Sequence, residues 1–364
     1  MRRVLTIIIV IILLIPPSAL ALDVFAEQSD AIGADNLGDA LPDGADDILG
    51  GMGVSDALDA PGAISRLVSG ITSKLRGIVT SSLRSAAVIV MAAMLSGLFT
   101  SAFPDKSANY ARLAGVFAIS AVSVASVNTF IGMGAAVIDD LGTFSKLLLP
   151  CLTAAAVAGG AVTSAAIKYS VTVMFLDILM NLMRTIIMPL IYAYAAVSVA
   201  EAAIGGDALS GVSSLIKWLA KTVLTAIVLV FVLYMSLTGV IAGASDAAAL
   251  RAAKVTISTV FPVVGTILAD AAGTLLSGAA ILRNAVGVFG VLAVAATCAV
   301  PFLKLGVNYL LFKAAGGLSA TVADASVTKL INAFGAAFGM TLGMAGVAAV
   351  MLFVSIVSTI KTVT

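Results

Sequence analysis

Four ionisable side chains stand inside long apolar stretches of this sequence: Asp177, Arg184, Asp270 and Lys313. A charged group inside a membrane is energetically costly, so such residues mark a polar pathway, a pair between helices or a snorkelling position near the surface. Asp177 and Arg184 are seven residues apart, which places them on one helix face but about 10 Å apart along its axis. A direct bridge between them needs a kink or a water molecule. Two interpretations stay open: Arg184 snorkels while Asp177 caps or pairs with another helix, or both line a transport pathway.

The residue types of the common catalytic sites are missing. The chain has no histidine, which removes histidine triads and histidine metal sites. Cys151 and Cys298 lie in apolar runs without metal-ligand spacing, and no phosphate-binding or dinucleotide motif occurs. The sequence therefore predicts no enzymatic activity, no catalytic residue, no metal and no cofactor. A net charge of +1 with scattered basic residues also predicts no nucleic-acid partner.

The composition determines the class of fold. Of 364 residues, 61% are hydrophobic and 11% charged, whereas soluble domains carry about 25% charged residues. Apolar runs long enough to cross a bilayer recur from Ala86 onward, with a mean hydropathy of +1.15 for the chain. These observations predict an all-α integral membrane protein, a polytopic helical bundle of about seven to eight spans in a lipid bilayer.

The first 84 residues divide into three segments. Residues 1–21 have the basic start, apolar run and small-residue end of a signal peptide, which predicts cleavage after Ala21 and an extracytoplasmic mature N-terminus. Residues 22–60 hold ten acidic residues and no Lys or Arg, which predicts a flexible extracytoplasmic segment. Residues 61–84 carry apolar side chains at steps of three and four, typical of an amphipathic helix that lies on the membrane or packs onto the bundle or a partner.

The polytopic membrane domain then covers residues 85–364. Tyr169–Ala200 is too long for one untilted span, so it is either one long kinked helix or is broken near Arg184 to Pro189. The predicted orientation places Asp139 and Asp140 in a loop on the extracytoplasmic side. The other predicted spans are Ala86–Phe103, Leu113–Ile138, Leu147–Ile167, Thr222–Ala244, Asn284–Leu303 and a last one within Phe334–Ile360.

Two stretches fit neither a span nor a soluble loop. Val255–Leu282 falls into two halves around Asp270, each below spanning length, and is predicted to be a re-entrant or an interfacial hairpin. Gly306–Val322 has Lys313 in its middle and two glycines after it, which favours a broken element.

Four motifs between Ser236 and Lys313 carry a family resemblance: AAKVTIS, FPVVG, LSGAAILRNAVG and PFLKLGVNYLL. In their order they resemble the stage III sporulation protein AE family of endospore-forming bacteria. The resemblance implies a multi-pass protein of the mother-cell membrane around the forespore. It also implies assembly with other stage III sporulation membrane proteins and a forespore membrane partner into a channel-like link that late forespore development requires. No catalytic residue is carried over.

Three functions remain for the experiments to separate. The leading hypothesis is a non-enzymatic, permease-like subunit of the sporulation channel complex between mother cell and forespore. The first alternative is a self-sufficient secondary transporter that uses Asp177, Arg184 or Lys313. The second is a membrane scaffold without a conduit.

Overall fold

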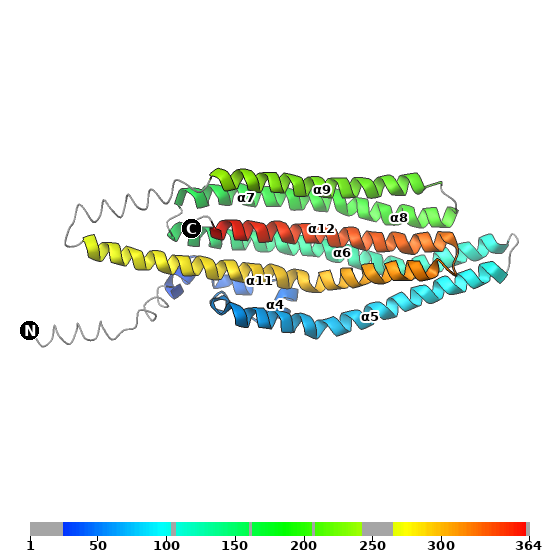
Figure 1. Cartoon of the computed structure of the whole chain (residues 1–364), viewed down its shortest axis with the longest axis horizontal. Helices are drawn as coiled ribbons and strands as arrows, with labels where there is room; N and C mark the ends of the chain where they lie inside the picture. Colours follow the sequence, from blue (N-terminus) through cyan, green and yellow to red (C-terminus); the bar gives the residue numbers. More distant parts are fainter. Residues whose placement is uncertain (1–24, 103–106, 160–161, 206–207, 242–264, 362–364) are drawn as a thin grey trace, which may run out of the picture.

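The computed structural model describes residues 25–102, 107–159, 162–205, 208–241 and 265–361, and all regular structure within them is helical. The prediction of an all-α fold is confirmed. The predicted signal peptide, residues 1–21, lies outside the described residues and stays a prediction. The helices run side by side along one long axis, and the start of the first long helix lies at the same end of the bundle as the end of the last (Figure 1).

The bundle is built from unusually long helices. At about 1.5 Å per residue, the longest extends for roughly 80 Å, more than twice the thickness of a hydrocarbon core. The long helices are α5 (Ala60–Ala102), α6 (Ser107–Ala158), α7 (Val162–Leu182), α8 (Met188–Ile204), α9 (Ser210–Ile241), α11 (Gly265–Ser319) and α12 (Ala325–Lys361). A π-helical turn, η2 (Met183–Ile187), joins α7 to α8 without a loop.

Six helical segments of the described residues are long and apolar enough to cross a membrane, counting α7 to α8 as one. Sequence analysis predicted seven or eight, and the difference arises in α6. This helix continues through Asp139 and Asp140, which were predicted to lie in a loop on the extracytoplasmic side. Leu147–Ile167, predicted to be a span of its own, instead contributes the end of α6 and the start of α7.

Helix α11 also contradicts a predicted break. It is one continuous helix from Gly265 to Ser319, so Gly306 and Lys313 lie within it and do not interrupt it. The second half of the predicted hairpin, Ala271–Leu282, is the first part of the same helix, with no break at Asp270. Residues 242–264, which hold most of the first half, lie outside the described residues.

The segment before α5 is folded against the bundle, whereas the sequence predicted a flexible one. It contains the short helices α3 (Asn36–Asp39), α4 (Asp43–Leu49) and η1 (Ser55–Leu58). Leu37, Leu49 and Met52 are almost completely buried. Acidic groups of this segment pair with bases of α5: Lys74 lies 2.7 Å from Asp47, and Arg66 lies 3.8 Å from Asp56. The predicted amphipathic helix of residues 61–84 is therefore the first half of α5, facing the acidic segment.

Aromatic rings from three helices meet at the centre of the bundle. Phe338 of α12 makes edge-to-face contacts with Phe312 of α11 and Phe130 of α6, with ring centroids 4.8 and 5.1 Å apart. Phe312 and Phe338 are among the fully buried side chains. Such pairs contribute about 0.5–1.5 kcal/mol beyond the burial of their area, so they hold α12 between its two neighbours.

Glycines four residues apart give α12 one face without side chains. A Cβ atom added at Gly335 would lie 3.2 Å from the Cβ of Phe312, and one added at Gly339 would lie 2.9 Å from the ring of Tyr309. Small residues at this spacing let membrane helices approach closely and gain dispersion contacts. Gly343 continues the same row toward Leu224 of α9. The row therefore determines how near α9 and α11 come to α12.

We expect Gly97→Ala to destabilise the protein, because a Cβ at Gly97 of α5 would meet the backbone carbonyl oxygen of Val322, in the turn before α12. The Cα of Gly97 and the carbonyl oxygen of Val322 can separate only if α5 or the turn before α12 shifts. Overpacking of this kind costs about 1–3 kcal/mol. The measurement is the temperature at which the purified protein unfolds in detergent.

The matched control is Gly132→Ala in α6, where an added Cβ has no atom within 4 Å. This variant should keep or raise the unfolding temperature, because alanine is favoured over glycine in helices by about 1 kcal/mol. Equal unfolding temperatures for the two variants would contradict the close contact at Gly97.

Candidate functional site

Two of the predicted site residues, Asp177 and Arg184, form ion pairs with α6 and not with each other. Arg184 Nη1 lies 2.6 Å from Asp139 Oδ1, and Lys146 Nζ lies 2.7 Å from Asp177 Oδ1. Residues on each helix are seven apart, and the helices are antiparallel, so the pairs form two rungs. All four side chains are between 41% and 60% exposed, which places the rungs on the outer surface of the bundle. They carry no net charge, which lowers the energetic cost of placing them in membrane-length helices.

The π-helical turn determines where the Arg184–Asp139 ion pair lies. Pro189 cannot donate a backbone hydrogen bond, and its ring clashes with the carbonyl four residues earlier in a regular α-helix. The widened turn η2 (Met183–Ile187) directly precedes it and accommodates this defect without breaking the helix. Within the turn, Arg184 is exposed toward α6, whereas Ile187 is 1% exposed and faces the interior.

The other two predicted residues separate. Asp270 lies in the first turns of α11, and its side chain is outside the described part of the chain. Lys313 lies near the other end of α11 and lines a cavity of about 450 Å³. No described feature brings Asp270 and Lys313 together, so the four residues do not form a common site.

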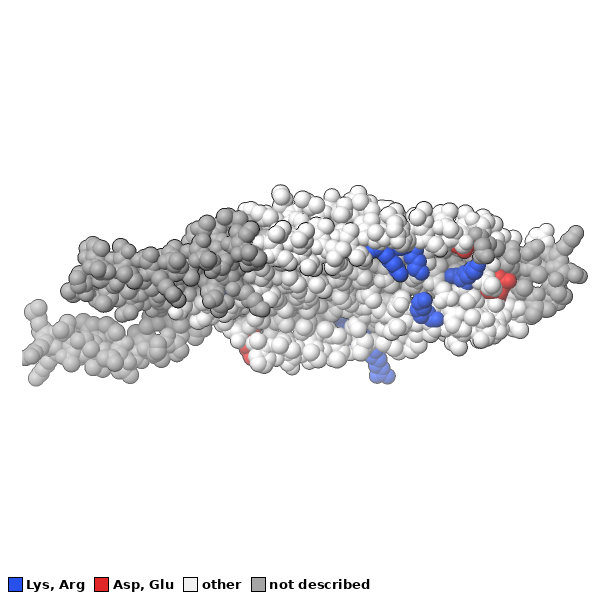
Figure 2. Space-filling model, turned by 45° about the horizontal axis from the view of Figure 1, so that its top comes forward, with Lys and Arg blue, Asp and Glu red and all other residues white. Residues whose placement is uncertain are grey.

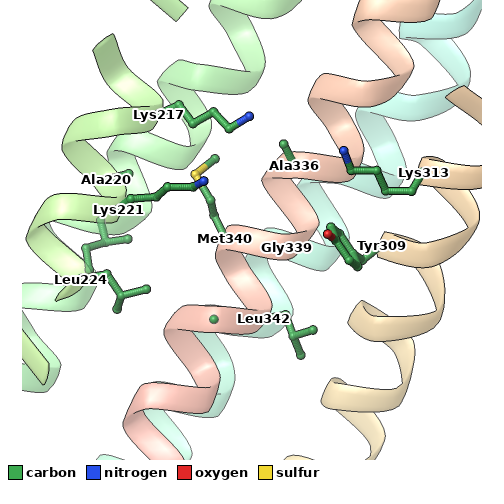
Figure 3. A pocket seen from close by; sticks show the side chains of 12 residues that line it. Lys217, Ala220, Lys221, Leu224, Tyr309, Lys313, Ala336, Gly339, Met340 and Leu342 are labelled. Atoms are coloured by element: carbon green, nitrogen blue, oxygen red, sulfur yellow. The ribbon is translucent and has the colours of Figure 1, made fainter. Parts of the chain in front are cut away.

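The cavity at Lys313 is formed by α9, α11 and α12, and Ile187 of η2 also lines it. Lys217 and Lys221 extend from α9 and Lys313 extends from α11, toward one another across α12 (Figure 3). The glycine row provides the floor, because Gly339 and Gly343 line the cavity between the lysines. We call this space the lysine cavity.

A second pocket of about 270 Å³ adjoins the lysine cavity and shares Lys217 and Lys313 with it. Its lining is polar and includes Lys329 of α12 and Glu201 of α8. Glu201 accepts a hydrogen bond of 2.8 Å from the Ser213 hydroxyl. Lys217 Nζ lies 5.9 Å from the centroid of the Tyr194 ring, a favourable contact for a cation. The two pockets together contain four lysines against one glutamate.

Three of these lysines, Lys217, Lys221 and Lys313, have no acidic partner within the described part of the chain. No described carboxylate lies within ion-pair distance of Lys217, Lys221 or Lys313. Lys217 and Lys221 stand four residues apart on one helix face, where like charges repel. Figure 2 shows basic side chains gathered in one region of an otherwise largely uncharged face. A concave, positively charged surface of this kind is suited to bind an anion.

Of the three lysines in the cavity, only Lys313 was predicted from the sequence as a candidate site residue. The residue types of Lys217 and Lys221, with Trp218 between them, indicate a position at a membrane interface but not a shared cavity. The glycine spacing of α12, at residues 335, 339 and 343, is the sequence signal that could have placed the three lysines in one site. Glycines at this spacing predict that neighbouring helices pack closely on one face of α12.

Helices of membrane length, ion pairs between them and a basic cavity inside the bundle define a multi-pass helical membrane protein. The sequence matches the family described as stage III sporulation protein AE over residues 56–362, and the chain belongs to this family.

A relative in Bacillus subtilis (strain 168), named stage III sporulation protein AE, is 24% identical over 219 residues. This alignment covers 60% of the chain and 55% of the relative, so the chain spans about half of the relative's length. No solved structure matches the chain.

We predict that Arg184→Gln destabilises the protein more by itself than when it is combined with Asp139→Asn. The single variant leaves the Asp139 carboxylate without its cation, and an uncompensated charge at the centre of a membrane helix costs about 2.5–3.5 kcal/mol. The double variant removes both charges. The measurement is thermal unfolding in phosphatidylcholine nanodiscs.

Arg76→Gln serves as the control for this cycle, because Arg76 is exposed on α5, away from the two rungs. Its unfolding temperature should equal that of the wild type. Additive effects of Arg184→Gln and Asp139→Asn would show that the Arg184–Asp139 pair contributes no coupling energy.

Proposed function

We propose that the protein is a non-enzymatic, multi-pass subunit of a sporulation channel complex in the mother-cell membrane around the forespore. There it links the two cells and supports late forespore development. The observation that carries this proposal is the family match over residues 56–362, which includes all six candidate membrane spans. Its partners are other stage III sporulation membrane proteins and a partner in the forespore membrane.

The exposed apolar surface of the bundle is suited to contacts with other membrane subunits or with lipid. Several side chains as large as leucine are more than half exposed on α5 and on α9, including Leu95, Leu98, Leu229 and Leu233. Surfaces of this kind face lipid or other proteins. An extracytoplasmic position for the segment before α5 would present its exposed aspartates to a partner between the two membranes.

Deletion of the gene in the host bacterium is expected to abolish heat-resistant spores and the expression of a late forespore reporter, while vegetative growth continues. A plasmid copy of the wild type should restore both readouts, and so should Gly132→Ala. Normal spore yield in the deletion strain would overturn the sporulation role. Loss of spores with unchanged late forespore expression would overturn the channel role.

A self-sufficient transporter is the alternative, because Lys313 lines a cavity. Lys313→Gln and Asp177→Asn separate the two functions. A transporter loses activity in both variants although it still copurifies with the other stage III proteins. The subunit proposal expects sporulation to fail only where copurification fails. Small-molecule flux through the purified protein in liposomes would rule out the third possibility, a scaffold without a conduit.

A further inference from the structure

An apolar groove between α9 and α12 adjoins the lysine cavity. This groove has a volume of about 670 Å³, and Gly343 lines both spaces. Along α9 the cavity and the groove are one helical turn apart, because Leu224 lines the cavity and Val228 lines the groove. The groove is also lined by Phe231, Val232, Val347 and Val350.

The two spaces lie at different depths along α9. Lys217, Trp218 and Lys221 have the residue types that mark a membrane interface, and Trp218 is 60% exposed. From Thr222 to Ile241 the helix carries no charge, and 20 residues span about 30 Å, the thickness of a hydrocarbon core. On this face of the bundle, the lysine cavity is therefore at headgroup depth and the apolar groove at acyl-chain depth.

We propose that the lysine cavity and the apolar groove together bind one anionic glycerophospholipid. Its phosphate lies among Lys217, Lys221 and Lys313, and an acyl chain lies in the groove between α9 and α12. Three ammonium groups without a described acidic partner complement a phosphate, and charge-assisted hydrogen bonds to phosphate are the strong ones. A soluble phosphate compound would use the same cavity but leaves the adjoining groove unexplained, so the apolar groove next to the cavity at Gly343 favours the lipid.

The test uses the full chain, purified in detergent and reconstituted in nanodiscs of phosphatidylcholine with or without phosphatidylglycerol. Bound lipid is measured by native mass spectrometry and by titration with a fluorescent phosphatidylglycerol. The first variant is Lys217→Gln, Lys221→Gln and Lys313→Gln together. Its charge-matched control is Arg76→Gln, Arg84→Gln and Lys304→Gln, none of which lines the cavity or the groove.

The second variant, Val347→Trp, fills the groove and leaves the lysines in place. Glycerol phosphate is titrated as a competitor that carries the headgroup chemistry without acyl chains. The unfolding temperature of each variant in phosphatidylcholine nanodiscs shows whether it is folded.

We expect the lysine variant to lose affinity for phosphatidylglycerol on the order of a hundredfold, since each lysine contributes roughly a factor of five toward an anionic lipid. The charge-matched control should bind as the wild type, Val347→Trp should also bind more weakly, and glycerol phosphate should compete poorly. Equal loss in the lysine variant and its control would overturn the site. Unchanged binding in Val347→Trp, or full competition by glycerol phosphate, would show a soluble phosphate site and overturn the lipid. The readouts come from purified protein, so they stand apart from the sporulation phenotype.

Discussion

The close approach of α12 to its neighbours is the contact on which the rest of the structure depends. The row of Gly335, Gly339 and Gly343 lets Phe312 and Tyr309 of α11 lie directly against the α12 backbone. Water is absent from a membrane interior, so helices there gain stability from close packing and not from removing apolar surface from water. The same row forms the floor of the lysine cavity. The glycine row of α12 thus both allows the close packing of the core and forms one wall of the lysine cavity.

Much of the fold was predictable, because a run of apolar residues long enough to cross a bilayer is a local property. What the sequence did not predict is how the runs are joined. Asp139 was expected to end a span, yet α6 continues through it because Arg184, 45 positions later, neutralises its charge. Likewise, Asp47 and Asp56 suggested a solvated segment, although bases of α5 pair with both. Pairs between distant residues leave no trace in local hydropathy.

For the candidate site too, the residue types were predictable from the sequence but their contacts were not. Lys313 was recognisable because a charge inside an apolar run is rare, and Lys217 and Lys221 because lysines next to a tryptophan are typical of an interface. That the three converge depends on the angle and distance at which α9 and α11 cross α12, which are set by packing (Figure 3). Asp177 and Arg184 were predicted as candidates for the same reason as Lys313, and the structure gives them separate partners on α6. Their residue types alone could not distinguish a pair from a pathway.

The exposed apolar surface places a further constraint on how the bundle meets a bilayer. On α5 the exposed residues Met91, Leu95 and Leu98 lie in the charge-free stretch after Arg84, whereas Ile64 and Val68, which are also exposed, lie among the basic residues of the first half. On α9, Leu229 and Leu233 follow Lys221, also in the second half, but the two helices end at opposite ends of the bundle (Figure 1). A layer perpendicular to the bundle axis cannot cover both surfaces. Either the bilayer crosses the axis obliquely, as helices longer than a hydrocarbon core require, or a partner protein covers one of the two surfaces.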